Sequence, residues 1–190
     1  NPVATLGTVT TASFTMSAAH MVTFTSVTQY LLTVTGGNNV AYGTASPITG
    51  DIGWYDASMS TTVSSDWVYN TAGSTRTALT NWQLSGVNQN PTRQYSGTLT
   101  TSSISMSAAL AVNFVSATQY QVSFHASGLD SEAGANTVLT VGLTPYVQSQ
   151  FPVDNVWVDS GTTFSWASPV SVGVGKQFIL HSDDGGLTSP

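Results

Sequence analysis

The sequence predicts an all-β protein made of two tandem immunoglobulin-like, Greek-key β-sandwich domains preceded by an N-terminal donor-strand segment. Three observations predict this fold: short β-prone runs broken by turn residues, the lack of a useful helical period, and a long internal repeat. The β-prone runs include LLTV, TTVSSDWVY, TVLTVGL and QFILH, and Gly, Asn, Asp and Pro separate them. A sandwich domain holds roughly 100 residues, so a chain of 190 residues has room for two.

The internal repeat is the most specific signal in the chain, because residues 8–34 align without a gap to residues 98–124. Further along, the alignment weakens but continues, with Trp54-Tyr55-Asp56 matching Trp157-Val158-Asp159 and Gly73-Ser74-Thr75-Arg76 matching Gly173-Val174-Gly175-Lys176. Gene duplication is the simplest explanation for this pattern. The pairs of identical residues include Met16/Met106, Ser17/Ser107, Val22/Val112, Phe24/Phe114, Gln29/Gln119 and Tyr30/Tyr120.

The register of the repeat sets the expected domain boundaries. A complete first domain runs over residues 28–117, from one TQY motif to the next, and the second domain occupies residues 118–190. The second domain lacks a counterpart of the closing strands, whereas residues 1–27 have the sequence of such strands with no domain before them. We therefore expect residues 1–27 to complete the C-terminal domain of a neighbouring molecule.

The expected donor strand has one apolar face, because alternate residues of a strand point to the same side. A strand added in this way would cover an exposed sheet edge. Burial of each large apolar side chain would stabilise the contact by about 1.5–3 kcal/mol. Repeated head to tail, the contact does not close and gives a polymer of the chain with itself. The residues predicted to form this interface are Ala12, Phe14, Met16, Ala18, His20, Val22 and Phe24.

An alternative register places residues 8–27 as the first strands of the first domain and residues 98–117 as those of the second. Both domains would then be self-contained. A monomeric cell-surface adhesin or carbohydrate-binding module would fit that arrangement, with some of the five Trp residues exposed for sugar stacking.

The composition argues against several partners. Three basic residues against nine acidic ones give a net charge of −6, which disfavours binding to nucleic acid or an anionic membrane surface. The chain has no Cys and no apolar stretch of the roughly 18 residues that a membrane span requires. A surface poor in Lys and rich in Thr is typical of an extracellular protein, and the start at Asn1-Pro2-Val3 suggests a processed product.

No residue pattern indicates catalysis or a cofactor. The three histidines His20, His125 and His181 lack the close spacing of zinc ligands, and no Gly-x-Ser-x-Gly motif supports a hydrolase. The acidic groups at 130–132 and 183–184 resemble turn sequences more than a calcium loop. We therefore expect a non-enzymatic protein without metal or cofactor.

The segments TQYQVSF, VLTV and FPVDNVWVDSGTTFSWASPVSVGVGKQFIL resemble the tandem β-sandwich repeats of archaeal secreted and cell-surface proteins. The resemblance covers most of residues 118–181 and, more weakly, residues 28–86. It implies an immunoglobulin-like fold on an extracellular protein, and the organisation is similar to that of donor-strand-complemented archaeal pilus and thread subunits. The expected function is that of a filament subunit, with an S-layer or sheath component as a related alternative.

Overall fold

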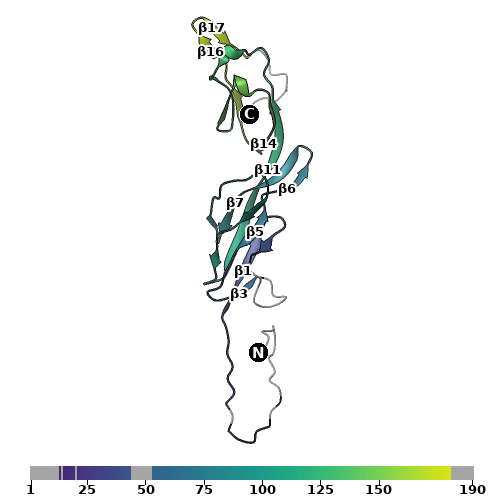
Figure 1. Ribbon diagram of the computed structural model, residues 1–190, viewed down its shortest axis with the longest axis vertical. Helices are drawn as coiled ribbons and strands as arrows, with labels where there is room; N and C mark the ends of the chain where they lie inside the picture. The colour runs from purple at the N-terminus through teal and green to yellow at the C-terminus, as the bar shows by residue number, and fades with distance from the viewer. Residues whose placement is uncertain (1–12, 14, 20, 44–52, 181–190) are drawn as a thin grey trace. The chain divides into compact units, whose positions relative to one another are not determined.

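The computed structural model describes residues 13, 15–19, 21–43 and 53–180, and over these residues the chain is all-β, as predicted. No α-helix occurs in this part of the chain, which contains two 3-10 turns, η1 (Ser131–Ala133) and η2 (Gln148–Gln150). Figure 1 shows the strands that build the molecule.

The strands of the first part of the chain are β1 (Gln29–Thr35), β2 (Ala41–Tyr42), β3 (Trp54–Asp56), β4 (Ser60–Thr61), β5 (Val63–Asp66), β6 (Val68–Ala72), β7 (Thr75–Leu84), β8 (Val87–Asn88), β9 (Thr98–Thr100), β10 (Ile104–Ser105) and β11 (Leu110–Phe124). Those that follow are β12 (Thr137–Val141), β13 (Thr144–Val147), β14 (Val153–Asp159), β15 (Phe164–Trp166), β16 (Val170–Gly173) and β17 (Lys176–Phe178).

The largest sheet is a curled, mixed sheet in the order β3-β1-β11-β7-β6, with β14 also paired to β11 and β8 to β7. The sheet is mixed because β1 and β11 run parallel to each other. In contrast, β3 pairs antiparallel with β1, and β14 pairs antiparallel with β11. Within the described residues there are four further, small sheets: β10-β4, β13-β12-β15, β16-β17 and β2-β5-β9.

The chain divides into two compact units, and the long strands β7 and β11 contribute to both. Unit 1 comprises residues 1–69 and 79–116, and unit 2 comprises residues 70–78 and 117–190. The core of unit 1 is the larger and is formed by Leu32, Tyr55, Val63, Trp67, Leu79, Trp82, Leu99, Ile104, Met106, Val112 and Phe114. The core of unit 2 consists of two smaller clusters, one of Phe124, Leu139, Val141 and Val153 and one of Ala133, Val138 and Val170.

The two units repeat the same strand pairing. In unit 1, Gln29 of β1 lies opposite Asp56 of β3, and its side-chain amide donates to the Asp56 carboxylate at 2.8 Å. In unit 2, Gln119 of β11 lies opposite Asp159 of β14 with the same hydrogen bond at 2.9 Å. The last residues of β11 therefore hold in unit 2 the place that β1 holds in unit 1.

The repetition extends to segments whose sequences have diverged. The N–H of Gly43 donates to the carbonyl of Thr62 at 2.8 Å, and the N–H of Gly142 donates to the carbonyl of Thr163 at the same distance. These bonds flank two corresponding strand pairs, β2 with β5 and β12 with β15. The duplication in sequence is thus also a duplication in hydrogen-bond pattern.

Candidate polymerisation interface

Four residues of the predicted donor face, Met16, Ala18, Val22 and Phe24, have identical counterparts in the second copy. The three large ones differ sharply in burial from their counterparts. The second copy of the donor sequence, which begins at residue 98, belongs to unit 1. There β9 pairs with β5, β10 with β4 and β11 with β1. The described residues between 13 and 28 form no strand. The exposed fractions are 65%, 49% and 75% for Met16, Val22 and Phe24, against 0%, 0% and 3% for Met106, Val112 and Phe114.

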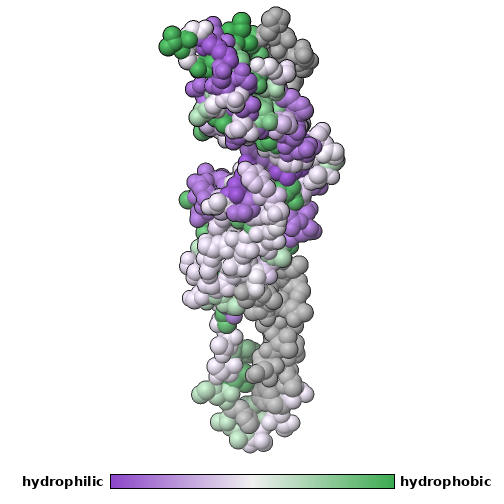
Figure 2. All heavy atoms as spheres, turned by 45° about the horizontal axis from the view of Figure 1, so that its top comes forward, coloured by the Kyte–Doolittle hydropathy of each residue, from purple (hydrophilic) through white to green (hydrophobic). Residues whose placement is uncertain are grey.

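The remaining predicted donor residues divide into two groups. Ala18 is exposed, as is its counterpart Ala108, whereas Ala12, Phe14 and His20 lie outside the described residues. Two further apolar side chains of the segment, Met21 and Val27, are also exposed. The segment accordingly carries hydrophobic colour in the lower part of Figure 2.

A buried polar cluster in unit 2 was not recognised from the sequence. The Arg76 guanidinium donates through Nε to Oε1 of Gln119 at 2.7 Å and lies 4.3 Å from the centre of the Trp157 ring. Gln119 in turn donates to Asp159, and both Arg76 and Gln119 are buried. The signal was present in the TQY motif, whose Gln recurs in both copies. Arg76 is therefore a structural cation.

Lys176 lies in an exposed ion-pair cluster with Glu132 and Asp130, at 2.5 Å and 3.2 Å from their carboxylate oxygens. These hydrogen bonds, first the one to Glu132, raise the pKa of Lys176 above its ordinary value. The pKa of Asp130 is lowered, chiefly because its carboxylate accepts from the backbone N–H of Glu132 and then because of Lys176. These ion pairs link the turn at η1 to β17, and exposed pairs of this kind contribute little to stability.

The histidines and acidic residues do not assemble into a metal site in the described part of the chain, which contains no group of three or more His, Cys, Asp or Glu residues suited to a metal ion. His125 is exposed and contacts Asp154 at 2.6 Å. His20 and His181 lie outside the described residues.

Four of the five tryptophans are engaged in packing. Trp67 and Trp82 belong to the core of unit 1, and Trp157 lies beneath Arg76. Trp166 stacks on Phe151 with ring centres 5.7 Å apart. These contacts cover part of the surface of these four side chains, whereas Trp54 is 37% exposed.

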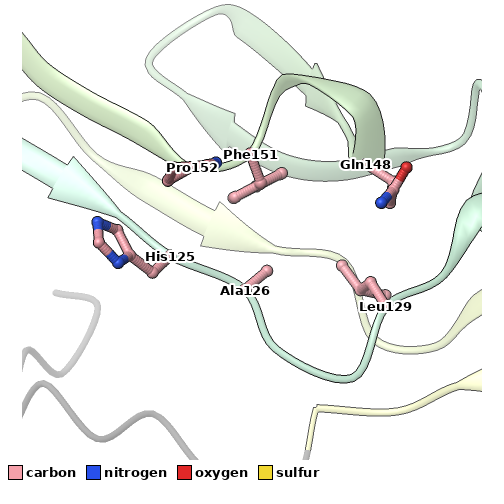
Figure 3. Close-up of a pocket in the computed structure, with 6 residues that line it drawn as sticks. All are labelled: His125, Ala126, Leu129, Gln148, Phe151 and Pro152. Atoms are coloured by element: carbon pink, nitrogen blue, oxygen red, sulfur yellow. The ribbon is translucent and has the colours of Figure 1, made fainter.

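Unit 2 has a cavity of about 270 Å³ at the end of β11. Figure 3 shows the chain that continues β11 on one side of it and the segment around η2 on the other. The exposed surface of this lining is more polar than apolar. The lining residues are His125, Ala126, Leu129, Gln148, Phe151 and Pro152.

The chain matches no protein-family model, no curated protein and no solved structure. Within the described residues, no helix has the length and apolar character needed to span a membrane.

Proposed function

We propose that the protein is a structural subunit of an extracellular filament, in which residues 1–27 of one molecule complete unit 2 of the next. The observation that carries this proposal is the contrast between the two copies of the donor sequence. Met16, Val22 and Phe24 are exposed, yet the same residue types in the same pattern are buried core residues of unit 1. A pattern built for burial and left exposed is typical of an interaction surface.

The proposal includes the finer fold assignment, in which both units are copies of one immunoglobulin-like sandwich. The repeated Gln–Asp pairs and the repeated Gly–Thr hydrogen bonds support a common ancestor for the two units. An extracellular location is favoured by the scarcity of charged side chains and by the resemblance to archaeal surface repeats. Assembly is the function in this proposal, and no catalytic step or cofactor is part of it.

The free energies of burial and association indicate how much of residues 1–27 must take part in the contact. Burying Met16, Val22 and Phe24 contributes roughly 5–9 kcal/mol in total. Association of two molecules costs roughly 4–15 kcal/mol in lost rigid-body freedom alone. Three side chains would therefore give a weak contact at best. A durable filament requires main-chain pairing along the strand as well as the other apolar residues of the face.

The direct test is removal of residues 1–27. The shortened chain is expected to stay monomeric in size-exclusion chromatography and to form no filaments in electron micrographs. A variant of full length, with Met16, Val22 and Phe24 all changed to Ser, should behave in the same way. A control variant with Thr15, Thr23 and Thr25 changed to Ser alters the opposite face and should still assemble.

Filaments that persist after removal of residues 1–27 would contradict the proposal. A full-length chain that stays monomeric at all concentrations and binds immobilised glycans would favour the adhesin alternative. Flat two-dimensional arrays in the micrographs would favour an S-layer or sheath.

A further inference from the structure

Unit 1 shows how the donor sequence pairs when it has a partner. The start of β11 runs parallel to β1, with Thr33 opposite Ala111, Val34 opposite Val112 and Thr35 opposite Asn113. The side chains of the last pair touch, because the Thr35 hydroxyl donates to Oδ1 of Asn113 at 3.1 Å. In the repeat, residues 111–113 correspond to residues 21–23 of the donor segment.

The matching position in unit 2 is the end of β11. Gln29 and Gln119 make the same bond to the neighbouring strand, so residues 33–35 of β1 correspond to residues 123–125. Successive residues of a strand direct their main-chain N–H and C=O groups to opposite edges, so the hydrogen bonds of β11 show which of its edges corresponds to the β11-facing edge of β1. The Thr118 carbonyl accepts from Ser160 on the β14 side, and the N–H of Gln121 donates to Ser74 on the other.

Ser123 follows Gln121 by two residues, so its main-chain groups face the same side as those of Gln121. The strand on that side is β7, which begins at Thr75. Beyond Gln121, no strand in the described part of the chain pairs with this edge of β11. An edge with unpaired main-chain groups can accept another strand.

We propose that this edge is the acceptor site of the filament contact and that it takes residues 21–24 of a second copy as a parallel strand. Met21 then lies opposite Ser123, Val22 opposite Phe124 and Thr23 opposite His125. This register rests on the proposed function, since it assigns the site at which the donor segment binds.

The cavity of unit 2 lies where this register places Phe24. Phe24 follows Thr23, so the register places Phe24 opposite Ala126, which lines the cavity together with His125. The cavity volume of about 270 Å³ exceeds the roughly 150 Å³ that suffices for a benzene molecule. A phenyl side chain that is 75% exposed in the free chain would lose most of that exposure there.

Two apolar residues after β17 correspond in the repeat to the part of β7 that pairs with β11 in unit 1. In unit 1, β11 lies between β1 and β7, and Leu79 of β7 is buried. The hairpin of β16 and β17 corresponds in the repeat to that of β6 and β7. Ile179 and Leu180, just past β17, are exposed.

The donor must come from another molecule because the chain is too short to reach its own acceptor edge. β11 has 15 residues and so is about 46 Å long at roughly 3.3 Å per residue. β1 pairs with the first residues of this strand, whereas the acceptor edge is at its end. Val22 precedes Gln29 by a stretch that spans about 25 Å at most when fully extended.

The register can be tested by disulfide cross-linking, since the chain has no native Cys. The double variant Met21→Cys with Ser123→Cys places both thiols at exposed positions, which preserves the cores. Under mild oxidation it should give a ladder of covalent multimers on non-reducing gels. The variant Met21→Cys with His125→Cys is displaced by one step along the same face and should cross-link far less.

A second measurement tests the cavity. Phe24→Ala should raise the critical concentration for assembly about tenfold to a hundredfold, from the loss of one buried phenyl group, while monomer unfolding stays unchanged. Val27→Ala is the control, because the second copy already carries Ala at the matching position, Ala117.

The outcomes separate this register from the proposed function. Filaments that require residues 1–27 but cross-link through the displaced pair would overturn the register and leave the proposed function standing. Filaments that form without residues 1–27 would overturn the proposed function. A disulfide within single molecules would overturn the assignment to a second copy.

Discussion

Two glutamines carry out the same structural task in the two units. Gln29 is half-buried and bonds to Asp56, whereas Gln119 is almost fully buried and bonds to both Asp159 and Arg76. A buried amide that loses a partner costs about 1–3 kcal/mol. The Arg76 guanidinium of unit 2 satisfies the amide oxygen of Gln119 and packs on the Trp157 ring.

Gly36, just after β1, shows how closely the first residues of β11 pack against this part of the chain. Gly36 has φ of +69°, and a Cβ at this residue would lie 2.3 Å from the carbonyl oxygen of Phe114. Gly36→Ala should therefore lower the free energy of unfolding of unit 1 by more than the roughly 1–3 kcal/mol that backbone strain alone costs. Gly97→Ala is a matched control, with φ of +78° and no atom within 4 Å of the added Cβ. Chemical denaturation of both variants measures the difference, and equal losses would contradict the close approach.

At the scale of elements, the sequence predicted the strands better than their pairing. Alternating apolar residues and turn residues identified β-strands, and the repeat identified corresponding segments. The parallel pairing of β1 with β11 and the span of β11 over both units depend on contacts between residues far apart in the chain. Neither periodicity nor turn residues carry that information, because each reports on local structure.

The two copies of the donor sequence allow a matched experiment on a single residue type. Met106→Ala removes a fully buried side chain and should lower the free energy of unfolding by about 2–5 kcal/mol. Met16→Ala, at the corresponding position, should leave monomer stability nearly unchanged and weaken assembly. Urea denaturation measures the first effect, and sedimentation of filaments measures the second. A large loss of monomer stability in Met16→Ala would show that Met16 packs within its own molecule.

At the scale of the whole molecule, the scarcity of charge determines which forces drive assembly. Charged residues make up 6% of the chain, and residues 1–27 contain no Asp, Glu, Lys or Arg. The proposed contact is therefore apolar and main-chain in character. The candidate donor face could be predicted from the repeat alone, whereas the acceptor edge and its cavity could not, because they depend on where β7 begins beside β11.

Salt should consequently have little effect on filaments or should favour them. In about 1 M NaCl the screening length falls to about 3 Å, which weakens the repulsion between subunits of net charge −6 and leaves hydrophobic burial intact. The critical concentration for assembly, measured by sedimentation, should stay level or fall as NaCl rises. A steep rise with salt would indicate that ion pairs hold the subunits together.

The continuity of β11 has a mechanical consequence for such a filament. One uninterrupted strand contributes to both units, and the donor segment leads directly into β1, which is parallel to it. Tension along these strands would load their lateral hydrogen bonds in shear, so that many bonds share the force at once. Peeling, in contrast, would break them one after another. We therefore expect filaments of this chain to resist pulling far better than they resist unzipping from a free end.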